Sequence, residues 1–266
     1  MTVAGSDSGG GAGIQADLRA FTFFKVFGTS ALTAVTAQNP QAVTDVAPLP
    51  PLSVEKQIAA ILAAFKVGAV KTGMLFSAEI IRSVAESLRA CRGVPRVVDP
   101  VMVATSGARL LRDDAVTALC DLLLPGATVI TPNLPEAEVL LARSLRTAAE
   151  SAPAVRELAR RFGGLVVLKG GHTHDAAAVD LISDGTRLWQ MASPRVAAAT
   201  THGTGCALSA ATAACLALGH EPLAALRLAK AYVYASLQCC VRVGPAAWAM
   251  TEPAALPVEE IVLREL

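Results

Sequence analysis

The sequence predicts an α/β protein whose central sheet is mostly parallel and is flanked by helices. Short runs of apolar, β-branched residues alternate along the chain with longer stretches whose apolar residues recur at helical spacing. Runs such as residues 165–168 (LVVL) are continuously apolar, which is typical of strands buried on both faces of a parallel sheet. Hydrophobic residues make up 53% of the 266 residues and aromatic residues only 4%. We therefore expect a core of Ala, Val, Leu and Ile.

The strands are expected where β-favouring runs are bounded by turn-forming residues. The segment 43–49 is interpreted as an edge strand, because Pro50 and Pro51 follow it and proline cannot donate to a sheet. The turn Ser183-Asp184-Gly185 predicts a hairpin, a small β element beside the parallel strands. In chain order, the expected strands cover residues 2–4, 30–35, 43–49, 69–71, 96–99, 128–131, 165–168, 179–182 and 187–191.

The helices are expected where apolar residues recur every three to four positions. The first carries Ile14, Leu18 and Phe21, and Ser53 and Ser77 are placed to cap the next two. The tail after Cys240 has little pattern, and no linker or repeat divides the chain, so residues 1–266 are expected to form one domain. After the first, the expected helices cover residues 53–65, 77–90, 113–124, 136–141, 153–162, 203–218 and 222–239.

The composition excludes several classes of protein. Lys and Arg number 23 against 22 Asp and Glu, and the net charge of +1 is too small for a general nucleic-acid binder or for polybasic membrane attachment. Residues 206–219, the longest weakly polar stretch, are fewer than the roughly 20 that span a membrane. The N-terminus lacks the pattern of a secretion signal. The six cysteines show no metal-site spacing, so we expect free thiols in the cytoplasm.

Two glycine clusters lie where a loop leads into a helix. Residues 5–13 (GSDSGGGAG) match neither the Walker A loop nor the dinucleotide fingerprint, yet they hold more glycine than a turn needs. At the carboxyl end of a parallel strand, such a loop favours a ligand site over a plain turn. Residues 201–206 (THGTGC) form the second cluster, and the free N–H groups of the following helix can bind an anion. A well-capped buried helix is an equal alternative for this second segment taken alone.

Eight short motifs, taken in order, resemble the bacterial hydroxymethylpyrimidine/phosphomethylpyrimidine kinases, the ThiD proteins of thiamine synthesis, within the ribokinase-like superfamily. Each motif is short, but their joint order from about residue 3 to residue 235 is highly specific. The motifs are GSD at 5–7 with GGAGIQAD at 10–17, TAVTAQN at 33–39, KTGML at 71–75, VVDPVMV at 97–103, Ser106-Gly107, TPNLPEAE at 131–138, LKGGH at 168–172 and THGTGCA at 201–207.

The resemblance implies a three-layer ribokinase-like fold with one active site at the strand carboxyl ends. It also implies ATP as phosphoryl donor, accompanied by Mg²⁺, and a pyrimidine alcohol or its monophosphate as acceptor. Many ribokinase-like proteins are dimers, so we expect a homodimer in which the edge strand at 43–49 contributes to the contact. Two departures stand out: Met1 nearly abuts the first strand, and Ala246-Ala247-Trp248 replaces a Gly/His-containing segment of the family near the C-terminus.

The catalytic residue is expected to be Cys206, in the turn formed with Gly203, Thr204 and Gly205. The wider superfamily has an aspartate base at this position, whereas the ThiD proteins resemble this chain in having cysteine. A thiol at a helix N-terminus has a lowered pKa, so Cys206 is expected to accept the hydroxymethyl proton or to orient that hydroxyl. The alternative is a small buried side chain, which we adopt for Cys91, Cys120 and Cys215.

The acceptor pocket is expected to include Gln38, whose amide offers the donor and acceptor pair that an aminopyrimidine edge requires. The other residues in this role follow from the resemblance. Asp17 would contact the aminopyrimidine, with a solvated helix carboxylate as its alternative, and Met74 could equally be core. The remaining wall positions are Gly5 and Val101.

The donor side is expected to include Asn133 and Glu136, whose spacing also fits a helix-capping box. In the superfamily this motif serves Mg²⁺ and phosphate, with the glutamate acting through water. Asp99 ends a strand, where a parallel sheet presents its ligands, and Lys169 follows another strand and could meet the ATP phosphates. His172 and His202 are interpreted as structural or as polar residues at the rim of the site.

Two other functions compete with the pyrimidine kinase. A pyridoxal or pyridoxine kinase is the nearer, because both acceptors are heteroaromatic hydroxymethyl compounds, although Gln38 and Met74 favour the pyrimidine. A catalytically inactive pyrimidine-binding regulator is the second. The intact Gly203-Thr204-Gly205-Cys206 turn argues against the regulator.

Overall fold

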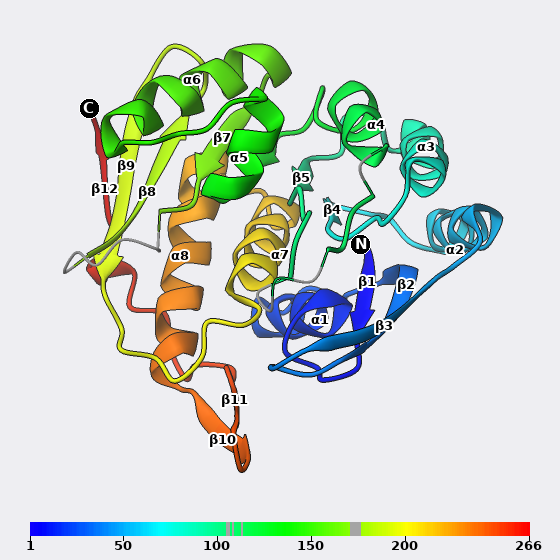
Figure 1. Ribbon diagram of the computed structural model, residues 1–266, viewed down its shortest axis with the longest axis horizontal. Coiled ribbons are helices and arrows are strands. Elements are labelled where there is room, and N and C mark those ends of the chain that lie inside the picture. The colour runs from blue at the N-terminus through cyan, green and yellow to red at the C-terminus, as the bar shows by residue number, and fades with distance from the viewer. Residues whose placement is uncertain (105–106, 108, 113, 171–176) are drawn as a thin grey trace.

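The computed structural model describes residues 1–104, 107, 109–112, 114–170 and 177–266 and has three layers, with a sheet between two groups of helices (Figure 1). In these residues the main sheet has ten strands. Their order across the sheet is β12 (Val262–Glu265), β9 (Leu188–Pro194), β8 (Ala177–Ser183), β7 (Leu165–Leu168), β6 (Val129–Ile130), β5 (Arg96–Val98), β4 (Val70–Thr72), β1 (Thr2–Asp7), β2 (Ser30–Gln38) and β3 (Val43–Pro48).

Parallel pairing joins the middle of the sheet from β7 through β6, β5, β4 and β1 to β2. The outer strands β3, β8, β9 and β12 pair antiparallel with their neighbours. The sheet is therefore mostly parallel, as the sequence predicts, and the expected hairpin is the pair β8–β9. β3 lies at one end of the strand order, which confirms that it is an edge strand.

Two helical layers cover the two faces of the sheet. Neighbouring valines of one strand, such as Val97 and Val98, belong to different core clusters because successive side chains of a strand point to opposite faces. Both faces are buried, which explains the continuous apolar runs of the central strands. One layer consists of α2 (Pro51–Ala64), α3 (Ala78–Ser87), α4 (Ala115–Leu122), α5 (Leu134–Leu141) and α6 (Ser151–Phe162), and the other of α1 (Gly13–Phe23), α7 (Thr204–Ala217) and α8 (Pro222–Gln238).

The helix starts differ from expectation where proline supplies the first turn. α2 begins at Pro51, so the prediction that Ser53 caps this helix was wrong; proline fits the first helical position because its missing N–H has no partner there. Ser77 does cap α3, and its side chain accepts from the Ile80 amide. α3 is shorter than predicted and is followed by the 3₁₀ turn η1 (Leu88–Cys91).

The tail after Cys240 is more ordered than its sequence pattern indicates. It forms the small hairpin of β10 (Val241–Gly244) and β11 (Ala247–Ala249), then the 3₁₀ turn η3 (Val258–Glu260), and finally β12. β12 pairs antiparallel with β9 and closes that edge of the main sheet. Its residues are mostly exposed, so the alternation of buried and exposed side chains that reveals other strands is weak here.

Some sequence predictions fall outside the described residues, namely those on Ser106, Asp113 and His172. A second short 3₁₀ turn, η2 (Ala148–Glu150), precedes α6. A search of the described residues finds no helix that combines the length and the apolar character needed to cross a membrane.

Candidate active site

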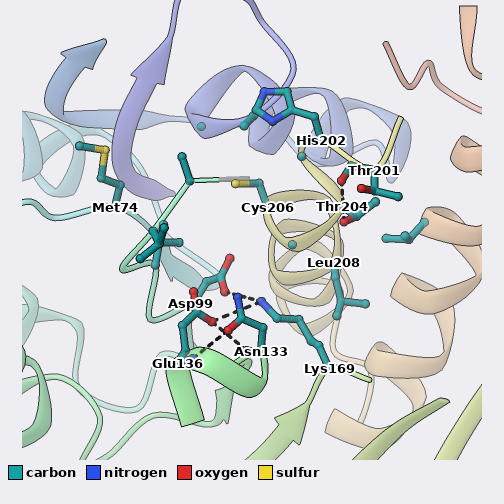
Figure 2. A pocket seen from close by; sticks show the side chains of 18 of the residues that line it. Met74, Asp99, Asn133, Glu136, Lys169, Thr201, His202, Thr204, Cys206 and Leu208 are labelled. Carbon is teal, nitrogen blue, oxygen red and sulfur yellow. Dashed lines mark hydrogen bonds and ion pairs between the residues drawn. The ribbon is translucent and has the colours of Figure 1, made fainter. Parts of the chain in front are cut away.

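A cavity of about 620 Å³ opens at the carboxyl ends of the parallel strands (Figure 2). It brings together residues that are far apart in the sequence, because adjacent parallel strands end at the same edge of the sheet. Of the predicted site residues, Asp17 does not line this cavity. Those that do are Gly5, Gln38, Met74, Asp99, Val101, Asn133, Glu136, Lys169, Gly203, Thr204, Gly205 and Cys206.

The first glycine loop is held in place by a buried carboxylate. Asp7 accepts hydrogen bonds from the amides of Gly9 and Ala12, each at 2.8 Å, and lies 3.0 Å from Nε2 of His202. Burial by itself raises the pKa of Asp7, but these hydrogen bonds hold the pKa below its ordinary value. His202 thus has the structural role expected of it: it connects the first glycine loop to the second.

The second glycine loop begins α7 and packs directly on the first. Gly203 has a φ of +86° and lies so close to the carbonyl of Gly11 that a Cβ at this position would clash with it. A Cβ added at Gly205 would lie 3.3 Å from Nζ of Lys169. The unpaired N–H groups and positive dipole end of α7 therefore lie beside an ammonium group. This combination is suited to an anion such as a phosphate.

A cluster of charged groups from the ends of three neighbouring strands, β5, β6 and β7, lines the part of the cavity where the sequence predicts the donor side (Figure 2). Nζ of Lys169 lies 3.1 Å from Oδ1 of Asp99 and 3.8 Å from Oε2 of Glu136. Oδ1 of Asp99 also accepts from the Thr131 hydroxyl at 3.1 Å. Asn133 and Glu136 form the complete capping box of α5, so the helix-capping interpretation of this spacing is confirmed. The capping box fixes Glu136 beside Lys169.

The two carboxylates of this cluster have opposite pKa shifts. Burial by itself raises the pKa of Asp99, but the ammonium groups of Lys169 and Lys71 and the hydrogen bonds to Asp99 hold its pKa below the ordinary value. For Glu136, burial raises the pKa to about 7, although Lys169 opposes the shift. Asp99 is therefore ionised at neutral pH, whereas Glu136 titrates close to it. The cluster has one permanent anion, one cation and one group that can exchange a proton.

Cys206 lies in the first turn of α7 and faces the cavity, as predicted, but the expected lowering of its pKa was wrong. Burial raises the pKa of this thiol to about 11, while the ammonium of Lys71 opposes the shift. The dipole of α7 was the basis of the expectation, and removal of the sulfur from water outweighs it. The resting residue is therefore a thiol at neutral pH.

The part of the cavity where the sequence predicts the acceptor side combines apolar walls with one amide. Met74 is 7% exposed and packs in a small cluster with Ala34 and Leu110. A Cβ at Gly5 would lie 2.9 Å from the sulfur of Met74, so the glycine makes room for this side chain. Gln38 ends β2, and its Oε1 accepts from the Thr36 hydroxyl at 3.1 Å. Its amide N–H₂ can therefore donate to a ligand.

The predicted contact of Asp17 with a ligand needs correction, because its side chain is completely buried behind Lys71. Nζ of Lys71 lies 2.9 and 2.8 Å from the two carboxylate oxygens of Asp17, and Oδ2 also accepts from Thr2 at 2.6 Å. Burial raises the pKa of Asp17, opposed chiefly by Lys71. Lys71, rather than Asp17, lines the cavity. Lys71 belongs to the KTGML motif, and nothing in the sequence indicated a role for it.

A second pair also escaped the sequence analysis. Lys230 on α8 lies 2.7 Å from Oδ2 of Asp180 on β8, and both line the far end of the cavity beyond Lys169. Oδ1 of Asp180 accepts from the Gly170 amide at 3.0 Å. A lysine within an otherwise apolar stretch of a helix was the available signal, since such a residue is seldom buried without a partner.

Comparisons of sequence point to one family. The family model described as phosphomethylpyrimidine kinase matches residues 7–251. A hydroxymethylpyrimidine/phosphomethylpyrimidine kinase of Rhizobium meliloti is 46% identical over 243 residues, which cover 91% of each chain. The thiamine biosynthesis bifunctional protein ThiED of Geobacter sulfurreducens is 44% identical over 244 residues, which are 92% of this chain and 50% of that protein. The chain thus spans about half the length of this relative.

Comparisons of structure show the same ribokinase-like fold. A pyridoxal kinase from Staphylococcus aureus in complex with AMP-PCP has a TM-score of 0.89 and 34% identity, covering 100% of this chain and 97% of that one. A phosphomethylpyrimidine kinase from Clostridium difficile has a TM-score of 0.76 and 38% identity, covering 88% and 96%. Kinases of both substrate classes therefore resemble this chain along most of its length.

Proposed function

We propose that this chain, which belongs to the phosphomethylpyrimidine kinase family, transfers the terminal phosphoryl group of ATP to 4-amino-5-hydroxymethyl-2-methylpyrimidine. A second transfer, to the monophosphate, would give the diphosphate used in thiamine biosynthesis. The names of its sequence relatives support both the reaction and the pathway. The Staphylococcus aureus kinase described in complex with AMP-PCP supports ATP as the donor.

The observation that carries the proposal is that one cavity is lined by a charged cluster around Lys169, by apolar side chains around Met74, and by Cys206. Lys169 and the N-terminus of α7 supply positive charge where the phosphoryl group would sit. Met74 and Gln38 supply an apolar wall and an amide where a flat ring with an amino group would sit. Phosphoryl transfer needs mainly such positioning and charge stabilisation.

The proposed step uses only groups that face this cavity. The hydroxymethyl oxygen attacks the terminal phosphorus as the bond to the bridging oxygen breaks, and ADP leaves. The hydroxyl proton passes to the sulfur of Cys206, which must be a thiolate to accept it. Lys169 and the amides of Gly205 and Cys206 stabilise the charge on the transferred group.

The donor side fits a magnesium ion that arrives with the nucleotide. Mg²⁺ prefers oxygen ligands, keeps several waters and is held by one or two carboxylates together with substrate phosphates. Asp99 and Glu136 supply carboxylate oxygens beside Lys169, and we propose that they act on the ion through bound water. The described residues contain no cluster of three or more His, Cys, Asp or Glu side chains that could cage a metal alone. When bound, Mg²⁺ neutralises phosphate charge.

The proposal is tested by steady-state kinetics with three acceptors in parallel: the pyrimidine alcohol, its monophosphate and pyridoxal, each with ATP and Mg²⁺. We expect the pyrimidine alcohol to have the highest kcat/KM, and phosphorus NMR to detect the monophosphate followed by the diphosphate. Phosphorylation of pyridoxal with no turnover of either pyrimidine would overturn the proposal.

A pyridoxal kinase is the second candidate, and one observation favours it. The structure of the Staphylococcus aureus pyridoxal kinase matches this chain with a higher TM-score than that of the Clostridium difficile phosphomethylpyrimidine kinase, 0.89 against 0.76. The pyrimidine remains our main proposal, because the sequence relatives are more nearly identical to this chain. The pyridoxal arm of the same assay distinguishes the two functions.

We also propose a cytoplasmic homodimer. All six cysteines are free thiols, which suits a reducing compartment. β3 leaves one edge of the sheet open to pairing, because it ends the strand order. A monomeric mass at micromolar protein concentration in light scattering would contradict the dimer.

A further inference from the structure

The helix that carries Cys206, α7, packs against both α1 and β4, and a buried ion pair joins these two elements. Lys71, on β4, and Asp17, on α1, both have side chains that are 0% exposed. The Lys71 side chain nevertheless forms part of the cavity lining. The reaction proposed above assigns no task to this pair.

Stability alone does not account for the pair. Removing two charges from water costs about as much as their attraction returns, so apolar replacements of a buried pair are often neutral or stabilising. The absence of a side chain at Gly73 also leaves room for the ammonium group, because a Cβ at this position would lie only 2.7 Å from Nζ of Lys71. An ammonium has three N–H groups, and in the described part of the chain two of its hydrogen bonds go to Asp17.

Charged groups of four elements act on the Cys206 sulfur. Lys71 on β4 and Lys169 after β7 are positive, and Asp17 on α1 and Asp99 after β5 are negative. The Gly13 amide, at the start of α1, donates toward the sulfur. Among the groups that lower the pKa of Cys206, Lys71 has the largest effect. Of the two carboxylates that raise this pKa, Asp17 has the larger effect.

We propose that Lys71 is a positioning residue whose positive charge stabilises the thiolate of Cys206, the form that accepts the hydroxymethyl proton, and that Asp17 limits this effect. The inference rests on the proposed phosphoryl transfer at Cys206 and deepens it. Lys71 touches neither reacting atom; it acts through the sulfur.

The proton balance of the step is simple. Before transfer, the thiol of Cys206 releases its proton to solvent, and the Lys71 ammonium stabilises the thiolate. The thiolate then accepts the hydroxymethyl proton as the new O–P bond forms and the bond to ADP breaks. After product release the thiol loses this proton to solvent again. Lys71 keeps its own proton throughout, because the nearby negative charges raise its pKa in spite of burial.

The test is the rate at which iodoacetamide alkylates Cys206 in the substrate-free protein, measured by mass spectrometry between about pH 7.5 and 10. Only the thiolate reacts, so the rate reports the thiolate fraction. Lys71→Met should slow alkylation of Cys206 about tenfold or more, and Asp17→Asn should accelerate it about tenfold or more, because one pKa unit changes the thiolate fraction tenfold. A purely structural role of the pair would move both rates in the same direction.

The control is Cys239 in the same digests. This half-buried residue follows α8, and its alkylation rate should not change unless the protein loosens as a whole. If Lys71→Met does not fold because Asp17 is left unpaired, the double variant Asp17→Asn/Lys71→Met replaces it. That variant buries no charge and differs from Asp17→Asn only in the Lys71 ammonium, so we expect it to react about tenfold more slowly than Asp17→Asn.

Equal Cys206 rates in Asp17→Asn and the double variant would overturn the proposal, as would shifts of both single variants in one direction. The pH at which kcat is half-maximal should move in the same directions as the alkylation rate. Alkylation needs no acceptor substrate, so it tests the effect of Lys71 on Cys206 separately from the proposed kinase activity. An inactive protein with the expected order of alkylation rates would count against the proposed kinase alone, and an active one without this order would count against Lys71 alone.

Discussion

Lys169 and Lys71 are both lysines that pair with an aspartate beside the same cavity, yet their surroundings differ. The side chain of Lys169 is 16% exposed and is shared between Asp99 at 3.1 Å and Glu136 at 3.8 Å. That of Lys71 is 0% exposed and contacts both oxygens of Asp17 within 2.9 Å. The first ammonium can exchange a protein partner for a ligand phosphate, whereas the second is fixed in place.

This difference teaches that a buried lysine is not by itself a ligand-binding residue. A cation that binds an incoming anion must be accessible and only loosely neutralised, as Lys169 is. A cation that is closely neutralised within the protein acts on its immediate neighbours, through the field that it creates in a medium of low polarity. We therefore assign Lys169 to the donor phosphates and Lys71 to Cys206.

The largest effect is expected from a substitution of Cys206, because Lys71 would act through this residue. Cys206→Ala should lower kcat about 10²–10⁴-fold, because general-base assistance is lost. Affinity for ATP should change little, since Lys169 and the N–H groups of α7 remain. Steady-state kinetics together with nucleotide titration would measure both. A Cys206→Ala enzyme that turns over at nearly the parent rate would remove the base from the account.

The control for this change is Cys206→Asp, which supplies the carboxylate base of the wider superfamily at the same position. We expect measurable activity from this variant, well above that of Cys206→Ala. Equal inactivity in both folded variants would show that the sulfur has some other task.

The titration of Glu136 tests how closely Lys169 is neutralised by its protein partners. Burial raises the pKa of this carboxyl from 4.5 to about 7, so between these values the folded state holds a proton that the unfolded state has released. Stability is therefore lost as the pH rises through this window, by about 3 kcal/mol in the free energy of unfolding. Urea unfolding at pH 5 and pH 8 should show this loss in the parent and not in Glu136→Gln.

The outcome that contradicts this prediction is a constant stability difference between parent and Glu136→Gln at the two pH values. Other groups titrate equally in both proteins, so the difference isolates Glu136. A constant difference would mean that Lys169 neutralises Glu136 fully, and the donor-side lysine would then be fixed as firmly as Lys71.

The smallest effect is expected at the acceptor wall. Gln38→Ala should weaken binding of the pyrimidine by about 1–3 kcal/mol, because a ring nitrogen or amino group loses its partner. Binding of ATP should be unaffected, since Gln38 ends β2 and four strands separate β2 from β7, which Lys169 follows. The KM values for the two substrates, measured separately, check this prediction. A pyrimidine KM equal to that of the parent would place Gln38 outside the acceptor pocket.

The sequence was sufficient to predict the layers of the fold and most of the cavity. Central strands such as Leu165–Leu168 are buried on both faces, so their composition alone identifies them. Polar residues at the carboxyl ends of parallel strands, such as Asp99 and Lys169, must share one edge of the sheet. The edge strand β12 escaped prediction, because a strand exposed along one side needs no continuous apolar run.

Properties that depend on contacts across the fold could not be predicted. The pKa of Cys206 depends on burial and on groups of α1 and β4, which lie far from it in the sequence, whereas the sequence indicates only the dipole of its own helix. Asp17 was expected to contact a ligand because it resembles a family residue with that role. Only the packing of α1 on β1 and the position of Lys71 show that its carboxylate is already paired.

The most direct test of this account is calorimetric titration of a non-hydrolysable ATP analogue with Mg²⁺ into two variants, Lys169→Met and Asp17→Asn/Lys71→Met. We expect Lys169→Met to bind the nucleotide at least about tenfold more weakly than the parent, because a charge-assisted contact to phosphate is lost. The double variant should bind the nucleotide within about twofold of the parent, because the two charges that it lacks act on Cys206 and not on the donor. Equal weakening in both variants, or weakening in the double variant alone, would contradict the division between the two lysines.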